Sequence, residues 1–456
     1  MLNTASTLTL TVFIFTVLFL IWRPRGLNES IPTAIGALCI FLIGTVNTSD
    51  IYKILGIVTG ASITIISTII MSIVLESVGF FRWAAFNLVT RSKGSGVLLY
   101  WNIICLCFLM TLFFNNDGSI LITTPIILEA LSTLKIQPHQ KIPFLLGGAL
   151  VATASSAPIG VSNLANLIAL KIVGLDLNTY AQIMLPPSML GILTLSLLIF
   201  FYYKKDIPKH INVKSRKRAL PPHIHQGNII PLHPLKQINN VVSLDVDWSM
   251  FKVYMTIIVF IRASFFALSD LGIPIEWIAI FGAVLMIVIR WYQQGTGIKD
   301  IIFKTPWHIL VFAFSMYVII YGLHNVGFTS ILVEVFKQPV SSDHYSAILI
   351  IGLVLTVLSN LFNNLPAVML GTLALTEMGL DPFTLQIAYL ANIIGSDIGS
   401  LIMPMGTLAT LIWMFILKKN KIPITWRQYL SVTIVVIPIS LLVSLISLYL
   451  WTELLY

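Results

Sequence analysis

The stretch LFFNND at residues 112–117 and its near-copy LFNNLP at 361–366 decide how this chain folds. Each places two adjacent asparagines inside a long apolar run. Asparagine tolerates turn geometry and carries both donors and an acceptor, so it suits a chain reversal within apolar surroundings. We therefore predict that residues 97–134 and 345–378, which are too long for single spans, are re-entrant hairpins with the asparagine pairs at their tips.

The composition is that of a polytopic membrane protein. Of the 456 residues, 57% are hydrophobic and only 10% are charged, and the mean hydropathy is +0.93. Soluble domains are near 45–50% apolar and about 25% charged. The apolar run at 8–22 follows no basic segment and precedes no cleavage motif, so it is predicted to be a first span. The three cysteines all lie in apolar segments, which argues against a disulfide framework.

The basic residues predict the orientation of the chain. With both termini outside the cell and both hairpins returning to the side they enter from, 23 of the 27 Lys and Arg residues fall in cytoplasmic loops. The positive-inside rule favours this arrangement. The net charge of +9 is thereby explained by the loops and does not indicate nucleic-acid binding. The expected location is the cell membrane, with lipid around a multi-pass protein.

The two halves of the chain resemble each other. SVGFF at 77–81 and NVGFT at 325–329 are offset by the same distance as the two asparagine pairs, and SNLANLI at 162–168 resembles GTLATLI at 406–412. In the predicted topology the halves start on opposite sides. The fold class is therefore predicted to be all-α and polytopic, with two inverted-topology repeats, about ten transmembrane helices, two re-entrant hairpins and two broken helices.

The domain prediction follows from the same reasoning. Its parts are an extra span with a basic loop (1–30), a first repeat (31–203), a basic cytoplasmic linker (204–248), a linking span (249–272) and a second, inverted repeat (273–456).

Small and hydroxyl residues interrupt the long apolar segments at 152–166 and 395–410, so an unwound centre is expected in each. Discontinuous helices in transporters enclose the substrate site near the bilayer midplane. The expected lining consists of hairpin-tip and break residues: Asn115, Asn116, Ser162, Asn163, Asn363, Asn364, Thr407 and Thr410. For the asparagines, stabilisation of the tip alone is the alternative to direct contact with substrate.

Charged residues inside the membrane are costly and usually functional. Asp117 and Asp397 are the candidates for carrying a coupling proton, and Glu76 is a third. Capping of a helix or a local ion pair is the alternative role for each. Arg262 is expected to extend outward to the interface, which would leave no basic residue at the midplane.

Several long blocks resemble the arsenite/antimonite efflux permease family (ArsB type) of the ion-transporter superfamily. They are WRPRG (22–26), FFNNDGSILITTPIIL (113–128), PWHILVFAFSMYVIIYGL (306–323), FNNLPAVML (362–370) and NIIGSDIG with PMGTLATLIWM (392–414). The resemblance covers essentially the whole chain. It implies export of arsenite or antimonite by proton antiport, with a cytoplasmic arsenic-pump ATPase as a partner in some members.

The chain departs from the family pattern in both breaks. Thr153 stands where the family typically has an aspartate, and Ser400 and Leu401 replace a Pro-Lys pair. A protonatable group and a basic group are therefore absent, which bears on coupling and on the exact substrate.

Two other functions stay open. A sodium-coupled anion carrier or a sodium/proton antiporter fits the same paired asparagines and hydroxyls, whereas a non-transporting sensor would not need duplicated polar breaks. No nucleotide-binding, esterase or metalloprotease motif is present, so neither an enzyme activity nor a resident metal or cofactor is predicted. A homodimer is compatible with the sequence.

Overall fold

The computed structural model describes residues 4–24, 27–211, 248–295, 297–422 and 424–456, and these residues form helices and turns without β-strands. The predicted all-α class is confirmed. Most of the predicted linker, residues 212–247, lies outside the described residues. The first half contains α1 (Thr4–Trp22), α2 (Ser30–Ile43), α3 (Thr48–Ser77), α4 (Phe80–Arg91), α5 (Gly96–Phe113), α6 (Asn116–Thr133), α7 (Pro138–Ala154), η2 (Gly160–Ser162), α8 (Leu164–Val173) and α9 (Leu177–Tyr202).

The second half repeats this order of elements after α10 (Trp248–Ala267) and η4 (Ser269–Leu271). It contains α11 (Ile275–Gln294), α12 (Lys299–Lys304), α13 (His308–Asn325), α14 (Phe328–Val340), α15 (His344–Phe362), α16 (Asn364–Glu377), α17 (Pro382–Asp397), η5 (Gly399–Ile402), η6 (Pro404–Gly406), α18 (Leu408–Lys419) and α19 (Trp426–Leu455). The succession α4–α9 thus matches α14–α19. The inverted orientation and the domain bounds stay predictions.

Local sequence explains why matching helices begin at matching residues. The glycine of each VGF motif, Gly79 and Gly327, has φ near +83° and +84°, and α4 and α14 start directly after it. Only glycine adopts this left-handed conformation without steric cost. A capping box formed by Asn47 and Asp50 starts the long α3, because the two side chains satisfy each other's backbone N–H groups.

Ten described helices are long and apolar enough to cross a membrane. This agrees with the predicted number, although the set differs. It includes α5 and α15, which are hairpin arms, whereas the predicted second span is α2, with 14 residues, short of the about 20 that a crossing needs. At about 1.5 Å per residue, α5 is roughly 27 Å long, close to the hydrocarbon thickness of ~30 Å. The re-entrant course of the hairpins stays a prediction.

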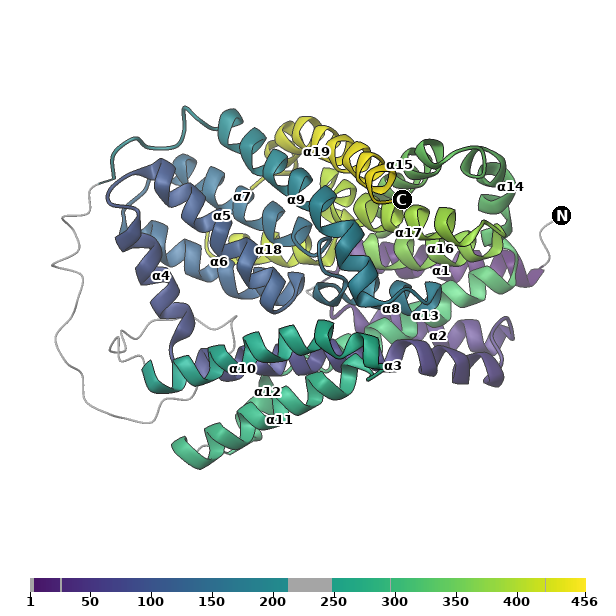
Figure 1. The fold of residues 1–456 in the computed structure, drawn as a ribbon, viewed down its shortest axis with the longest axis horizontal. Helices are drawn as coiled ribbons and strands as arrows, with labels where there is room; N and C mark the ends of the chain where they lie inside the picture. The colour runs from purple at the N-terminus through teal and green to yellow at the C-terminus, as the bar shows by residue number, and fades with distance from the viewer. Residues whose placement is uncertain (1–3, 25–26, 212–247, 296, 423) are drawn as a thin grey trace.

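The two hairpins lie toward opposite ends of the longest axis (Figure 1). α4–α7 occupy one end and α14–α17 the other, and α9 packs against α19 across the middle. After its break, each half sends a short helix to the other half: α8 packs against α16, and α18 packs against α6. This exchange brings the two breaks into the same central region, where the polar groups described next are buried.

Candidate functional site

The first hairpin tip, between α5 and α6, is buried and satisfies its own backbone. Asn115 caps α6, because its Oδ1 accepts the backbone N–H of Gly118 at 2.6 Å. Asn116 Oδ1 accepts the N–H of Asp117 at 2.8 Å. Asp117 is half-buried in the first turn of α6, where a carboxylate interacts favourably with the positive end of the helix dipole.

Arg262 of α10 binds the carbonyl side of this tip. Its Nε donates to Phe113 O at 2.8 Å and its Nη2 to Phe114 O at 2.6 Å. The residue is only 7% exposed. The expectation that Arg262 extends to the interface is therefore wrong: the last carbonyls of α5 offer it hydrogen-bond acceptors at the tip, so the guanidinium stays inside the protein.

The second tip has the same asparagine pair but another geometry. Asn363 has φ of +81°, in the left-handed region, and its Nδ2 donates to Met405 O in the second break at 3.2 Å. Asn364 is buried as the first residue of α16. The second tip is thus fastened to the break of its own half, whereas the side-chain bonds of the first pair lie within α6.

The first break, residues 155–163, separates α7 from α8. Asn163 caps α8 by accepting the N–H of Ala165 at 3.0 Å. Two buried tyrosines hold the backbone within and just after the break, since Tyr180 donates to Ala157 O at 2.7 Å and Tyr389 donates to Asn166 O at 3.1 Å. Ser162 Oγ is buried and has no hydrogen-bond partner among the described residues.

The carboxylate of Asp397, the last residue of α17, is held by the first break. Asn163 Nδ2 donates to its Oδ1 at 2.9 Å. Ser156 Oγ and Asn166 Nδ2 donate to its Oδ2 at 2.8 Å and 2.7 Å. Asp397 is 0% exposed. Three donors and the adjacent N-terminus of α8 would stabilise the ionised form of this carboxyl, whose burial would otherwise be very costly.

The second break, residues 398–407, is tied to α15 and α19. Asn360 Nδ2 donates to Gly399 O at 2.8 Å, and its Oδ1 accepts the N–H of Met403 at 2.7 Å. From α19, Tyr429 and Thr433 donate to the carbonyls of Leu401 and Ile402. The backbone groups freed by this break are therefore satisfied by side chains, as the apolar interior requires.

Thr407 and Thr410 occupy the repeat positions of Asn163 and Asn166. Thr407 Oγ1 accepts the N–H of Thr410 at 3.1 Å and so caps α18, and the two hydroxyls lie 2.9 Å apart. Both threonines are buried. The capping role recurs in both halves, but here the hydroxyls bind each other and not a carboxylate.

The structure brings Asn163 and Asp397 together. It also places Asn363 beside the second break, which ends at Thr407, and Thr410 follows in the first turn of α18. Glu76, by contrast, is exposed near the end of α3. Sequence reasoning missed Ser156, Asn166, Asn360 and Arg262. Asn166 could have been found, because it follows Asn163 by three residues and so shares its helix face. The partners of the other three are visible only in the fold.

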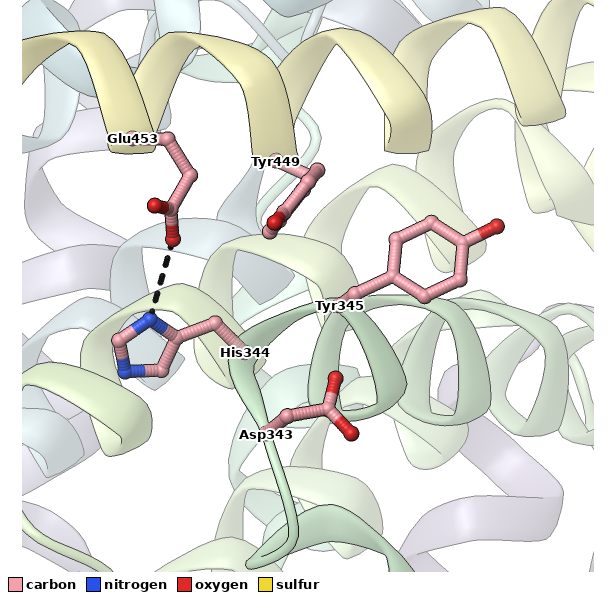
Figure 2. Close-up of a pocket in the computed structure, with 5 residues that line it drawn as sticks. All are labelled: Asp343, His344, Tyr345, Tyr449 and Glu453. Atoms are coloured by element: carbon pink, nitrogen blue, oxygen red, sulfur yellow. Dashed lines mark hydrogen bonds and ion pairs between the residues drawn. The ribbon is translucent and has the colours of Figure 1, made fainter.

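The pocket in Figure 2 is separate from these groups. It has a volume of about 250 Å³ and is lined by Asp343, His344, Tyr345, Tyr449 and Glu453, with His344 Nδ1 lying 3.3 Å from Glu453 Oε1. It lies where the start of α15 meets the end of α19, whereas the polar residues of the two breaks are buried away from it.

Comparison with known proteins gives the family. The profile of the arsenical pump membrane protein family (ArsB) matches residues 8–452. A Bacillus subtilis (strain 168) relative is 48% identical over 97% of this chain and 99% of its own length. An Escherichia coli "Arsenical pump membrane protein" is 30% identical over 96% of this chain and 97% of its own. A solved structure of the Alcanivorax borkumensis YdaH transporter has a TM-score of 0.49 at 11% identity, covering 97% of this chain and 99% of that one. This chain therefore belongs to the ArsB family of arsenical pump membrane proteins and is a multi-pass membrane transporter.

Proposed function

We propose that this protein exports arsenite or antimonite across the cell membrane by proton antiport, with substrate bound between the hairpin tips and the two breaks. Family membership supports the substrate class. The observation that carries the coupling proposal is the contact of the Asp397 carboxylate with Ser156, Asn163 and Asn166. It joins the end of α17 in one half to the break of the other half.

The chemistry of the break residues suits a small neutral hydroxide. Arsenite and antimonite in their hydroxide form carry no charge at neutral pH and present oxygen atoms that donate and accept hydrogen bonds. Amide and hydroxyl side chains at the tips and breaks offer both kinds of partner. Asn116, Asn364, Thr407 and Thr410 are therefore the proposed contacts with substrate, with Ser162 beside them.

The hydroxyl of Ser156 lets the Asp397 carboxyl change protonation state without losing a hydrogen bond. Ser156 Oγ lies 2.8 Å from Asp397 Oδ2 and also 2.8 Å from Thr153 O. When Asp397 is ionised, Ser156 donates to it. When Oδ2 carries a proton, that proton is donated to Ser156 Oγ, and the serine hydroxyl turns to Thr153 O. Asn163 cannot adapt in this way, because its oxygen caps α8.

A sodium-coupled carrier is the second candidate. Ser162 Oγ, Asn363 Oδ1 and Ser400 Oγ are buried oxygen atoms without a hydrogen-bond partner among the described residues. Oxygen atoms of this kind are ligands for hard cations. In this candidate sodium would bind at the breaks, and Asp397 would contribute negative charge without exchanging a proton.

Everted membrane vesicles distinguish the two candidates. Arsenite and antimonite uptake is measured with an imposed pH gradient, acidic inside, or with a sodium gradient of matched size. The proposal predicts uptake that follows the pH gradient and collapses when a protonophore removes it. Asn364→Ala is expected to slow uptake about tenfold, the effect of one lost hydrogen bond to substrate.

Uptake that requires sodium and ignores the pH gradient would replace proton antiport by the second candidate. Vesicles that move neither arsenite nor antimonite under any gradient would remove the proposed substrates. A cytoplasmic ATPase as energising partner is proposed only if added ATP and cytosol raise uptake beyond the rate that the pH gradient supports.

A further inference from the structure

One edge of the Arg262 guanidinium donates hydrogen bonds, and the Nη1 edge has no acceptor among the described residues. Nε and Nη2 hold the carbonyls of Phe113 and Phe114. Nη1 is buried and has no hydrogen-bond partner among the described residues. The ring of Phe265, one turn further along α10, lies 5.4 Å from the guanidinium carbon. Two carbonyls and one aromatic ring therefore fix the orientation of this side chain.

The bound carbonyls explain why a positive charge is stable at this place. Phe113 is the last residue of α5, and the final carbonyls of a helix have no partner within the helix. They form the negative end of the helix dipole, which favours a cation. The salt bridges found among the described residues do not include Arg262. Its buried positive charge is therefore stabilised by the carbonyl groups of the tip.

A free N–H pair on a buried charged group is costly, and an oxygen atom is the acceptor that removes the cost. The guanidinium that carries Nη1 donates hydrogen bonds to the carbonyls of Phe113 and Phe114. These two residues directly precede Asn115, the first of the predicted substrate contacts. The oxygen that it lacks is therefore to be sought at the first hairpin tip.

We propose that Arg262 Nη1 donates a hydrogen bond to an oxygen atom of the transported arsenite or antimonite, which makes Arg262 a substrate-binding residue on α10. The inference rests on the proposed function. The two carbonyl bonds hold the guanidinium in place, and the remaining edge takes the substrate. α10, predicted as a linking span, thereby contributes to the site.

Two variants separate substrate contact from a purely structural role. Arg262→Lys keeps the charge near the tip carbonyls but lacks the second edge of the guanidinium, and Arg262→Gln keeps amide donors without charge. Each full-length variant is purified, and its melting temperature is measured with and without antimonite. A ligand that binds the folded state raises this temperature, so the ligand-induced increase reports binding, whereas the ligand-free value reports structure.

The expected result is a KM for antimonite raised about tenfold in Arg262→Lys, the effect of one charge-assisted hydrogen bond, with most of the maximal rate kept. The antimonite-induced rise in melting temperature should shrink in both variants. Arg290→Lys is the matched control, because Arg290 is also buried but pairs with Asp300 through both Nη atoms. It should lower the ligand-free melting temperature and leave the antimonite effect intact.

All measurements are repeated with Cys39, Cys105 and Cys107 changed to alanine, since thiols bind arsenic and antimony directly. An unchanged KM and an unchanged antimonite effect in Arg262→Lys would overturn the inference and leave a water molecule as the partner of Nη1. A wild-type protein that transports neither compound would instead be a failure of the proposed function. If Arg262→Lys does not fold, Arg262→Gln decides on the same two readings.

Discussion

The two breaks have similar sequences and cap their following helices in the same way, but their polar side chains bind different partners. Ser156 and Asn163 of the first break, with Asn166 of α8, donate to the carboxylate of Asp397. The equivalent residues of the second half are Ser400 and Thr407 in the break and Thr410 in α18, and the position that corresponds to Asp397 is Thr153. The threonine hydroxyls bind each other, and Ser400 Oγ is buried without a partner among the described residues.

The backbone of the second break is bound by more side chains than the backbone of the first. Carbonyls of the second break accept hydrogen bonds from four side chains, those of Asn360, Asn363, Tyr429 and Thr433. Tyr180 binds the first break itself, at Ala157 O, and Tyr389 binds just after it, at Asn166 O. The second break is therefore braced by its own half, whereas the first is braced in part by a charge from the other half. Asp397 belongs to the second half and contacts the first break, so a change in its charge would act on both halves.

The largest effect is expected from Asp397→Asn. The variant replaces the carboxyl that binds Ser156, Asn163 and Asn166 by an amide that carries no exchangeable acid proton, so transport driven by a pH gradient should fall on the order of 100-fold, the size of losing one proton-transfer group. Uptake of antimonite into everted vesicles measures it. Asp117→Asn is the control at the other candidate carboxyl and should retain most of the activity. Equal losses in the two variants would contradict the assignment to Asp397.

Asn360→Leu tests the bracing of the second break. It removes the donor to Gly399 O and the acceptor for Met403 N–H and leaves both groups buried, at a cost of roughly 2–4 kcal/mol in stability. The melting temperature of the purified protein should fall clearly. Leu112 holds the equivalent position in the first half, so the first break manages without this brace. A variant as stable as the wild type would show that the second break is not held by Asn360.

Asn163→Ala and Thr407→Ala compare the two helix caps directly. Both lose a cap, worth about 1 kcal/mol. Asn163→Ala also removes one donor to a buried carboxylate, worth roughly 1.5–3 kcal/mol more if Asp397 is ionised. Thermal unfolding in detergent should therefore rank Asn163→Ala as the less stable. Equal destabilisation would indicate that the Asn163–Asp397 bond contributes nothing.

The smallest effect is expected from the serine pair. Ser156→Ala removes the hydroxyl that we propose binds Asp397 in both of its protonation states, and vesicle uptake should slow by roughly tenfold at most. Ser400→Ala removes a hydroxyl without a described partner and should leave the rate near that of the wild type. A stronger loss in Ser400→Ala than in Ser156→Ala would favour a ligand role for Ser400, as the sodium-coupled candidate requires.

The sequence was sufficient to locate the helix ends at the asparagine pairs and the two breaks, because each is marked by polar residues that an apolar segment does not otherwise tolerate. It was insufficient to predict which residues bind one another across the fold. Asp397 binds donors more than 230 residues away, and no local pattern predicts such a pairing. The position of Arg262 was predicted wrongly for the same reason. The carbonyl groups that bind it belong to the backbone, so the residue types at those positions do not reveal them.

In the proposed antiport, Asp397 changes protonation state during transport while its neighbours keep it hydrogen-bonded. Infrared difference spectroscopy tests this most directly, by comparing the purified wild-type protein with and without antimonite in the region where protonated carboxyl groups absorb. We expect a carboxyl band that changes on antimonite addition in the wild type and is missing in Asp397→Asn. The same band in both proteins, or no change in the wild type, would contradict it.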